Sequence, residues 1–160
     1  MHPATRLTTV QLTPSDTGRA HGLLDVFSEA FEDPGTYGRA RPGPDCLRRL
    51  LGSDTFIALA AVQDDEVVGG LAAYELHKIE QARSEIYIYD LAVRASHRRL
   101  GVATALIRHL QALALRIQLQ WPRLPVYVQA DYGDDPAVAL YTKLGVREDV
   151  MHFDLPVPGT

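Results

Sequence analysis

Residues 90–104 read DLAVRASHRRLGVAT, in which the end of an apolar strand passes into a basic loop and then into a helix. The strand signal stops before the first arginine, and the helix is expected to open near Gly101. Exposed backbone N–H groups at a helix N-terminus attract phosphate, and Gly101 permits close approach. Because Arg98 and Arg99 add charged donors and Thr104 adds a hydroxyl, the stretch predicts a phosphate-binding loop.

A simpler interpretation of this stretch is a solvated basic loop with an ordinary glycine, because short Gly/Arg patterns recur by chance. The stretch is not a P-loop, since it lacks the Gly-Lys-Ser/Thr end, and it does not contain GxGxxG. From these residues alone both interpretations stay open.

The chain before this loop predicts mostly strands. Apolar and β-branched runs indicate four of them, at Arg6–Leu12, Thr55–Val62, Val67–Leu76 and Ser84–Val93. The polar residues 63–66 favour an antiparallel hairpin. Two helices are expected between the first two strands, one capped by Ser15 or Asp16 and a short one over Cys46–Leu51. Between these helices, the Gly/Pro-rich residues 34–44 are long enough for a functional lid.

The chain after the loop alternates helices and strands. Leu106, Leu110, Leu113 and Ile117 form a helical stripe, and Trp121-Pro122 ends that helix. A strand over Val126–Ala130, a helix over Pro136–Leu144 and a last strand over Val150–Leu155 complete the order βααβββαβαβ. This order predicts a single α/β (α+β) domain over residues 1–160, with a core at about 6–155 and a mostly antiparallel first half.

Composition excludes several classes of protein. The chain has 160 residues, 46% of them hydrophobic, and a net charge of −4, which argues against a nucleic-acid partner and leaves a cationic small molecule open. The single cysteine, Cys46, forms no internal disulfide. Residues 1–12 lack a signal-type apolar run, and no run approaches the ~18 apolar residues of a membrane span. We therefore expect no membrane association and a cytoplasmic location.

A second motif lies at residues 134–145, DDPAVALYTKLG, where Asp135 is expected to cap a helix that carries Tyr141. A lone helical tyrosine most often packs. Arg98-x-x-Gly101-x-Ala103, however, resembles the acyl-CoA pyrophosphate signature of the GNAT N-acetyltransferase superfamily, and 137–145 resembles its second block. Residues 55–61, 83–93, 128–145 and 150–154 resemble the type I aminoglycoside 3-N-acetyltransferases. Residues 115–123 depart from that pattern.

This resemblance implies a mixed, largely antiparallel sheet that is splayed at the cofactor site, with helices on both faces. It implies that acetyl-CoA is the co-substrate, with pantetheine along the strand at Leu91, Ala92 and Val93. One N–H group there would polarise the thioester carbonyl. Tyr141 would protonate the leaving thiolate. The pyrophosphate would be bound by Arg98, Arg99, Leu100, Gly101, Val102, Ala103 and Thr104.

The acceptor amine must lose a proton, and Asp90 is the candidate that takes it, directly or through water, with Glu85 as the alternative. A structural hydrogen-bonding role for Asp90 stays open. Carboxylates that could bind a polycation are Asp131, Asp134 and Asp135, and Glu29, Glu32 and Asp33, although such runs are usually solvated faces. Tyr37, in the related loop before the second helix, is also a candidate substrate-binding residue, as is Glu85. Stacking on sugars is open to Tyr87, Tyr89 and Tyr132, although packing is their commoner role.

The resemblance therefore implies acetyl transfer to the 3-amino group of deoxystreptamine aminoglycosides, by direct attack in a ternary complex, with antibiotic resistance as the outcome. Two alternatives stay open: the same chemistry on a polyamine, amino sugar or peptide N-terminus, and a non-catalytic binding module. The six histidines show no metal-ligand spacing, and acetyl transfer needs no metal. Dimers are common in the superfamily, and pairing of C-terminal strands is one route to a homodimer.

Overall fold

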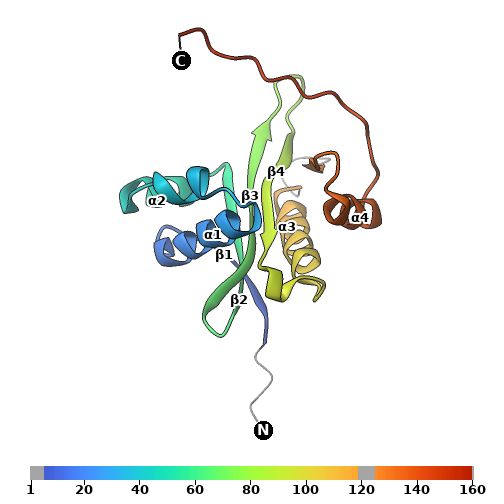
Figure 1. Ribbon diagram of the computed structural model, residues 1–160. Helices are drawn as coiled ribbons and strands as arrows, with labels where there is room; N and C mark the ends of the chain where they lie inside the picture. Colours follow the sequence, from blue (N-terminus) through green and yellow to red (C-terminus); the bar gives the residue numbers. More distant parts are fainter. Residues whose placement is uncertain (1–5, 119–124, 160) are drawn as a thin grey trace. The chain divides into compact units, whose positions relative to one another are not determined.

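The structure is a computed structural model that describes residues 6–118 and 125–159 (Figure 1). It divides into two compact units, Met1–Gln129 and Ala130–Thr160. The predicted helix end at Trp121-Pro122 lies outside the described residues. No helix among the described residues is long and apolar enough to cross a membrane.

One five-stranded sheet forms the first unit, in the order β1-β2-β3-β4-β5. The first four strands are antiparallel, and β5 runs parallel to β4. At the predicted hairpin, Asp64 and Asp65 both have positive φ angles, of 52° and 63°, as a two-residue turn of type I′ requires. Five of the six predicted strands are confirmed, with these bounds: β1 Thr8–Gln11, β2 Phe56–Gln63, β3 Glu66–His77, β4 Ser84–Val93 and β5 Val126–Val128.

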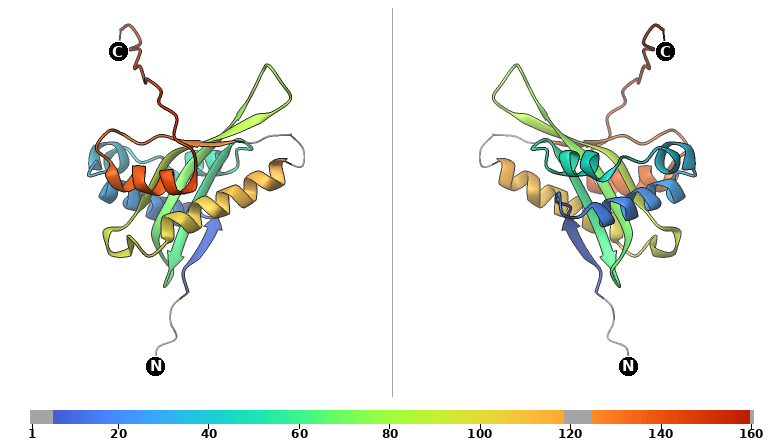
Figure 2. Two further views of the ribbon diagram at one scale, coloured as in Figure 1. Left: turned by 90° about the vertical axis from the view of Figure 1, so that its right-hand side faces the viewer. Right: turned by 90° about the vertical axis from the view of Figure 1, so that its left-hand side faces the viewer.

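Helices cover both faces of this sheet (Figure 2). Helices α1 (Thr17–Ala30) and α2 (Pro44–Leu51) lie on one face, and α3 (Val102–Gln118) lies on the other. Within α3, the stripe residues Leu106 and Leu110 are fully buried. The predicted mixed, mostly antiparallel sheet with helices on both faces is therefore confirmed.

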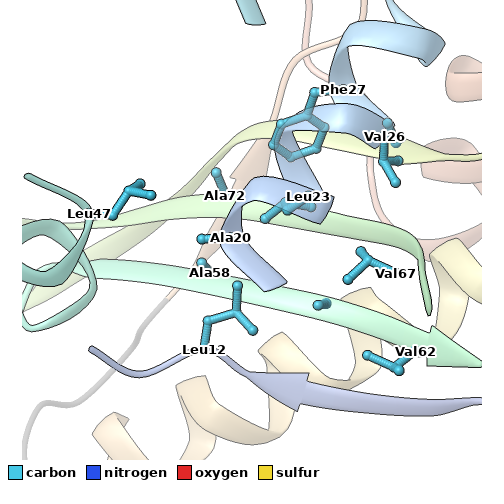
Figure 3. Close-up of a cluster of buried hydrophobic side chains, with 12 residues drawn as sticks. Leu12, Ala20, Leu23, Val26, Phe27, Leu47, Ala58, Val62, Val67 and Ala72 are labelled. Carbon is cyan, nitrogen blue, oxygen red and sulfur yellow. The ribbon is translucent and has the colours of Figure 1, made fainter. Parts of the chain in front are cut away.

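Small residues on the sheet allow α1 to pack closely against it. Leu23, Val26 and Phe27 of α1 lie over strand residues that include Ala58 and Ala72 (Figure 3). Gly70 in β3 is needed for this approach. A Cβ atom there would lie 2.3 Å from Leu23 Cδ1 and 2.5 Å from the Leu59 carbonyl oxygen. The fold thus fixes α1 directly over the middle of the sheet.

The second unit contains helix α4 (Asp135–Leu144). Its N-cap is Asp134, whose side chain accepts a 3.2 Å hydrogen bond from the Ala137 N–H, so the prediction of Asp135 as the cap was wrong by one position. The predicted last strand, Val150–Leu155, was also wrong: residues 146–157 form no strand in the described chain. An extended segment becomes a strand only when a neighbouring strand pairs with it, and none does so among the described residues.

Candidate active site

A β-bulge in β4 brings Asp90 onto the sheet face that α1 covers. Ala73 pairs with Ile88 and Ala72 pairs with Asp90, so Tyr89 is an extra residue in the ladder. In a regular strand Asp90 and Ile88 would share a face, because side chains alternate. The extra residue shifts this alternation by one position. The Asp90 side chain therefore lies on the same face of the sheet as its partner Ala72, which belongs to the core under α1.

Asp90 is held there by the loop that follows α1. The Tyr37 hydroxyl donates a 2.8 Å hydrogen bond to Asp90 Oδ1. Burial raises the pKa of the Asp90 carboxyl, and the hydrogen bond from Tyr37 opposes part of that rise. Burial, followed by the bond to Asp90, also raises the pKa of Tyr37 well above its ordinary value, so Tyr37 remains a donor. The result is a partly desolvated carboxylate with one oxygen fixed.

The loop that carries Tyr37 has its own local order. Glu32 has a φ of 53° and ends α1, and a π-helical turn, η1 (Gly35–Arg39), follows. Asp33 Oδ1 accepts a 2.9 Å hydrogen bond from the Thr36 N–H. The Thr36 hydroxyl, followed by this N–H, lowers the pKa of Asp33. Asp33 therefore stabilises the start of this turn, a structural role in addition to the acceptor-binding role predicted for it.

Aromatic rings surround this carboxylate from two sides. The Tyr37 ring packs against Phe27 and Phe31, with centroids 5.8 Å and 5.5 Å apart. On the sheet, Tyr74 contacts Tyr89, with ring centroids 6.1 Å apart. Tyr89 is 72% exposed and Tyr74 is 37% exposed, so both rings are open to a ligand.

Tyr87 and Phe56 extend the aromatic row on the sheet, because Tyr87 contacts Tyr89 and Phe56 contacts Tyr74. Tyr74 was not predicted as a site residue, since it lies in an apolar strand whose pattern is typical of a buried core. The alternation of side chains along β3 is the signal that places it beside Tyr87, its partner in the ladder.

Glu85, the alternative proton acceptor, forms salt bridges with two cationic side chains. Its Oε1 lies 3.0 Å from Arg83 Nη1 and 3.6 Å from Lys78 Nζ. Glu29 lies 3.9 Å from Arg94 Nε, and Arg94 also pairs with Glu66 at 2.5 Å. Asp90 differs from Glu85 and Glu29 in that its described hydrogen-bond partner is a tyrosine rather than a cation.

The predicted phosphate loop follows β4 directly. Beyond Ile88, β4 pairs with β3 on one side only among the described residues, because the ladder to β5 ends at Ile88 and Val128. The edge of Leu91, Ala92 and Val93 that faces away from β3 is therefore free to pair with an extended ligand.

The loop itself then turns through two left-handed residues, Arg99 with a φ of 62° and Gly101 with a φ of 82°. Helix α3 begins at Val102, so the N–H groups of Val102, Ala103 and Thr104 have no acceptor within the helix. Arg98, Arg99 and Leu100 are exposed, and Arg98 Nε donates to the Val93 carbonyl oxygen at 3.2 Å. This arrangement of open strand edge, arginines and helix N-terminus can bind a chain that ends in phosphate.

In the second unit, Asp131, Asp134 and Asp135 are exposed around the start of α4. Asp134 is used as the cap, and Asp135 lies in the first helical turn. Tyr132 is almost fully exposed. Burial and the charge of Asp134 raise the pKa of Tyr141 to about 12, so Tyr141 keeps its proton at neutral pH.

Within the part of the chain that the structure describes, neither Cys46 nor a histidine is hydrogen-bonded to these site residues. His109 contacts Thr9 Oγ1 through Nδ1 at 3.0 Å, and Cys46 is exposed. Within residues 6–118 and 125–159, no cluster of three or more His, Cys, Asp or Glu side chains could hold a metal ion.

Comparison with known proteins gives consistent similarities. The chain matches the acetyltransferase (GNAT) family over residues 21–146. An N-alpha-acetyltransferase of Sulfurisphaera tokodaii is 31% identical over 93 residues, 52% of this chain and 54% of that protein. The match therefore spans about half the length of this curated relative.

Among solved structures, an aminoglycoside acetyltransferase from an uncultured soil metagenomic sample is 54% identical, with a TM-score of 0.90, over 95% of this chain and 99% of the other. A second aminoglycoside acetyltransferase of that kind, in complex with sisomicin, is 27% identical, with a TM-score of 0.83, over 94% of this chain and 96% of the other.

Proposed function

Because this chain belongs to the acetyltransferase (GNAT) family, we propose that it acetylates aminoglycosides, at the 3-amino group of deoxystreptamine, with acetyl-CoA as the donor. Such an activity in the cytoplasm would confer antibiotic resistance. The proposal is supported by the 54% identity to an aminoglycoside acetyltransferase over nearly the whole of both chains. The observation that carries it is the Asp90 carboxylate, bonded to Tyr37 and beside exposed aromatic rings.

This group suits a cationic sugar for physical reasons. A carboxylate with limited hydration attracts an ammonium group more strongly than a solvated one does. The faces of Tyr74 and Tyr89 can accept sugar rings and neighbouring ammonium groups through cation–π contact. In the second unit, Asp131, Asp134 and Asp135 add exposed negative charge, which raises the local concentration of a polycation.

The proposed transfer makes one bond and breaks one. The acceptor nitrogen gives one proton to Asp90, directly or through water, and then forms a C–N bond to the acetyl carbonyl carbon. The carbon–sulfur bond breaks as the amide forms and the nitrogen releases its second proton to solvent. Tyr141 gives a proton to the departing sulfur and is reprotonated from solvent, and Asp90 releases its proton to solvent before the next turnover. Burial of Asp90 makes it a stronger base than an ordinary aspartate.

For the donor we propose the strand edge and loop described above. The backbone of Leu91, Ala92 and Val93 would pair with pantetheine, and one N–H group there would polarise the thioester carbonyl. The loop residues 98–101 and the first N–H groups of α3 would bind the pyrophosphate. Bound acetyl-CoA supplies the activated acetyl group; the protein supplies position and proton acceptance.

A thiol-release assay tests this function, with gentamicin-type and kanamycin-type aminoglycosides as acceptors and NMR of the product to locate the new amide. We expect acetylation of the 3-amino group. Acetylation at another amino group would contradict the regiochemistry. Turnover of a polyamine, a free amino sugar or a peptide N-terminus, with no aminoglycoside accepted, would support the alternative acceptors; no product in a single turnover with any amine would indicate a binding module.

We also propose that the protein forms a homodimer through its C-terminal segment. Met151, Phe153 and Leu155 are 82%, 70% and 83% exposed, and the polar His152 and Asp154 alternate with them. This is the pattern of a strand with one buried face. Burial of each large apolar side chain stabilises by about 1.5–3 kcal/mol, so a second copy that pairs with this segment would gain both backbone hydrogen bonds and apolar contact.

The dimer is tested by sedimentation over a range of protein concentrations. The variant with Phe153→Ser and Leu155→Ser is expected to be monomeric, whereas Ile79→Ser, a change of a fully exposed residue between β3 and β4, should leave the assembly unchanged. A wild-type protein that sediments as a monomer at all concentrations would contradict the proposal.

A further inference from the structure

Arg41 joins the loop after η1 to helix α1 and to the residue that holds Asp90. Its Nη2 donates a 2.6 Å hydrogen bond to Asp25 Oδ1 in α1, and its Nε donates a 3.0 Å hydrogen bond to the carbonyl oxygen of Tyr37. The Arg41 side chain is three-quarters buried, with a relative exposure of 26%. One guanidinium therefore connects a fixed helix to the backbone of Tyr37.

The carbonyl of Tyr37 requires such a donor because of its place in η1. The turn ends at Arg39, and Ala40 has non-helical backbone angles. The Tyr37 carbonyl therefore lies in the last turn, where carbonyl groups have no N–H partner within the helix. An unpaired, partly buried carbonyl destabilises the turn, and the Arg41 side chain supplies the missing donor.

Tyr37 is thus restrained at three points. Its N–H donates to the Asp33 carbonyl oxygen at 3.2 Å, its carbonyl accepts from Arg41, and its ring packs against Phe27 and Phe31. These restraints aim the hydroxyl at Asp90 Oδ1. Ring packing alone would leave the ring free to slide, since aromatic contacts tolerate a range of offsets.

We propose that Arg41 is a positioning residue of the acetyl transfer, which acts through Tyr37 to orient Asp90. The described hydrogen-bond partners of Arg41 are Asp25 and the Tyr37 backbone, and not Asp90 itself. The proposal rests on the proposed role of Asp90 as proton acceptor. The proposal extends that role, because the orientation and the pKa of the Asp90 carboxylate then depend on the salt bridge between Arg41 and Asp25 of α1.

Because of the groups that face Asp90, the influence of Arg41 on this carboxylate can be measured by titration. They are tyrosines from each packed element, Tyr37 of η1, Tyr74 of β3 and Tyr89 of β4, with Asp33 acting on Tyr37. Burial raises the pKa values of Tyr37 and Tyr74, so these two side chains stay neutral between pH 4 and 8. A change in the titration midpoint of Asp90 therefore reports on its hydrogen bond from Tyr37.

The test compares Arg41→Gln, Tyr37→Phe and the double variant by NMR titration of labelled aspartate carboxyl groups in the ligand-free enzyme, and by kinetics. Loss of the Tyr37 bond should raise the titration midpoint of Asp90 in both single variants. With the amine that the enzyme accepts, Arg41→Gln should lower kcat about fivefold and leave KM for acetyl-CoA unchanged. In the Tyr37→Phe background, Arg41→Gln should lower kcat almost no further, because both substitutions remove the same hydrogen bond from Tyr37 to Asp90.

Two further variants complete the design. Arg39→Gln changes an exposed arginine of the same turn and should leave both readouts at wild-type values. Arg41→Lys can keep one of the two contacts and should restore part of the activity. Additive effects of Arg41→Gln and Tyr37→Phe, or an unchanged Asp90 midpoint in a folded Arg41→Gln protein, would overturn the proposal. Because the titration needs no substrate, it gives its result even if aminoglycosides are not accepted.

Discussion

The Tyr37 hydroxyl and Asp90 Oδ1 lie 2.8 Å apart, although 53 positions separate the two residues in the chain. The contact exists because two local irregularities face each other: a π-helical turn carries Tyr37, and a β-bulge turns Asp90 toward it. Each irregularity alone would leave its side chain pointing elsewhere. Together they fix one oxygen of a partly buried carboxylate, and among the described residues no hydrogen bond to Oδ2 is seen, so this oxygen is open to an incoming amine.

Asp90→Asn is expected to lower kcat by about a hundredfold or more, the usual contribution of a positioned acid or base. The amide keeps the size of the side chain and can still accept from Tyr37, but it cannot take a proton. Steady-state kinetics with the accepted amine measure the effect. Loss of less than threefold would remove Asp90 from the role of proton acceptor.

The same change should stabilise the folded protein at neutral pH. Burial raises the pKa of Asp90, so the folded state binds its proton more tightly than the unfolded state does. The contribution of Asp90 to the free energy of unfolding is therefore fully present below the ordinary aspartate pKa, and it is lost as the pH rises through the raised pKa of the folded state. Asp90→Asn should raise the Tm at pH 7 by about 2 °C and have little effect near pH 3.5, as thermal melts at both values can check.

Tyr37→Phe should move the acidic limb of kcat/KM to higher pH. The Tyr37 hydrogen bond favours the ionised form of Asp90 and lowers its pKa, so removal of the bond raises that pKa. Activity that needs ionised Asp90 is then lost at a higher pH as the solution is acidified. A profile measured from pH 5 to 9 reports the limb; a limb that shifts toward lower pH would contradict this account.

The sequence predicts these parts of the site unequally. The strand–loop–helix junction proposed to bind phosphate was predictable because its residues are contiguous, and strand, arginines and helix start follow one another within 90–104. The bulge at Tyr89 was not predictable from strand periodicity, because the run from Ser84 to Val93 is strand-like throughout and the extra residue appears only when β3 supplies the register.

Other differences have similar causes. Asp134 and Asp135 are both good N-caps, and only the backbone angles decide between them. The pattern of Val150–Leu155 is that of a strand, but strand formation depends on a partner that a local pattern does not contain. Arg41 carried no signal in the sequence, since its role arises from a carbonyl left unpaired where η1 ends. Short-range motifs were thus predictable, and contacts between distant segments were not.

Gly70→Ala should destabilise the fold by about 1–3 kcal/mol or more, the usual effect of added volume in a close-packed core. The new Cβ would lie 2.5 Å from the Leu59 carbonyl oxygen, which is backbone and cannot move without disturbing β2. Urea denaturation measures the change in the free energy of unfolding. A stability equal to that of the wild type would show that α1 and the sheet adjust freely at this point.

Tyr141→Phe should lower kcat with little change in the affinity for acetyl-CoA, because it removes a proton donor and keeps the ring. Without that donor the leaving sulfur departs as a thiolate. Single-turnover kinetics and a separate binding measurement distinguish the two quantities. An unchanged kcat would exclude Tyr141 as the acid.

Gly101→Ala tests the phosphate loop through backbone conformation alone. Gly101 has a φ of 82°, and a Cβ there would meet no atom within 4 Å, so the substitution adds strain without a clash. The left-handed conformation costs about 1–2 kcal/mol for a residue with a Cβ, and relaxation of the loop would turn the N–H groups at the start of α3 away from their common direction. We therefore expect a Tm lower by a few degrees and a KM for acetyl-CoA raised about tenfold, with kcat less affected.

Gly18→Ala is the matched control, since it also adds a Cβ in open space but lies in helix α1. Alanine at this helical position should slightly raise the Tm and leave KM unchanged. A Gly101→Ala protein with a lowered Tm and a wild-type KM would show that the loop is strained for a purpose other than binding the pyrophosphate.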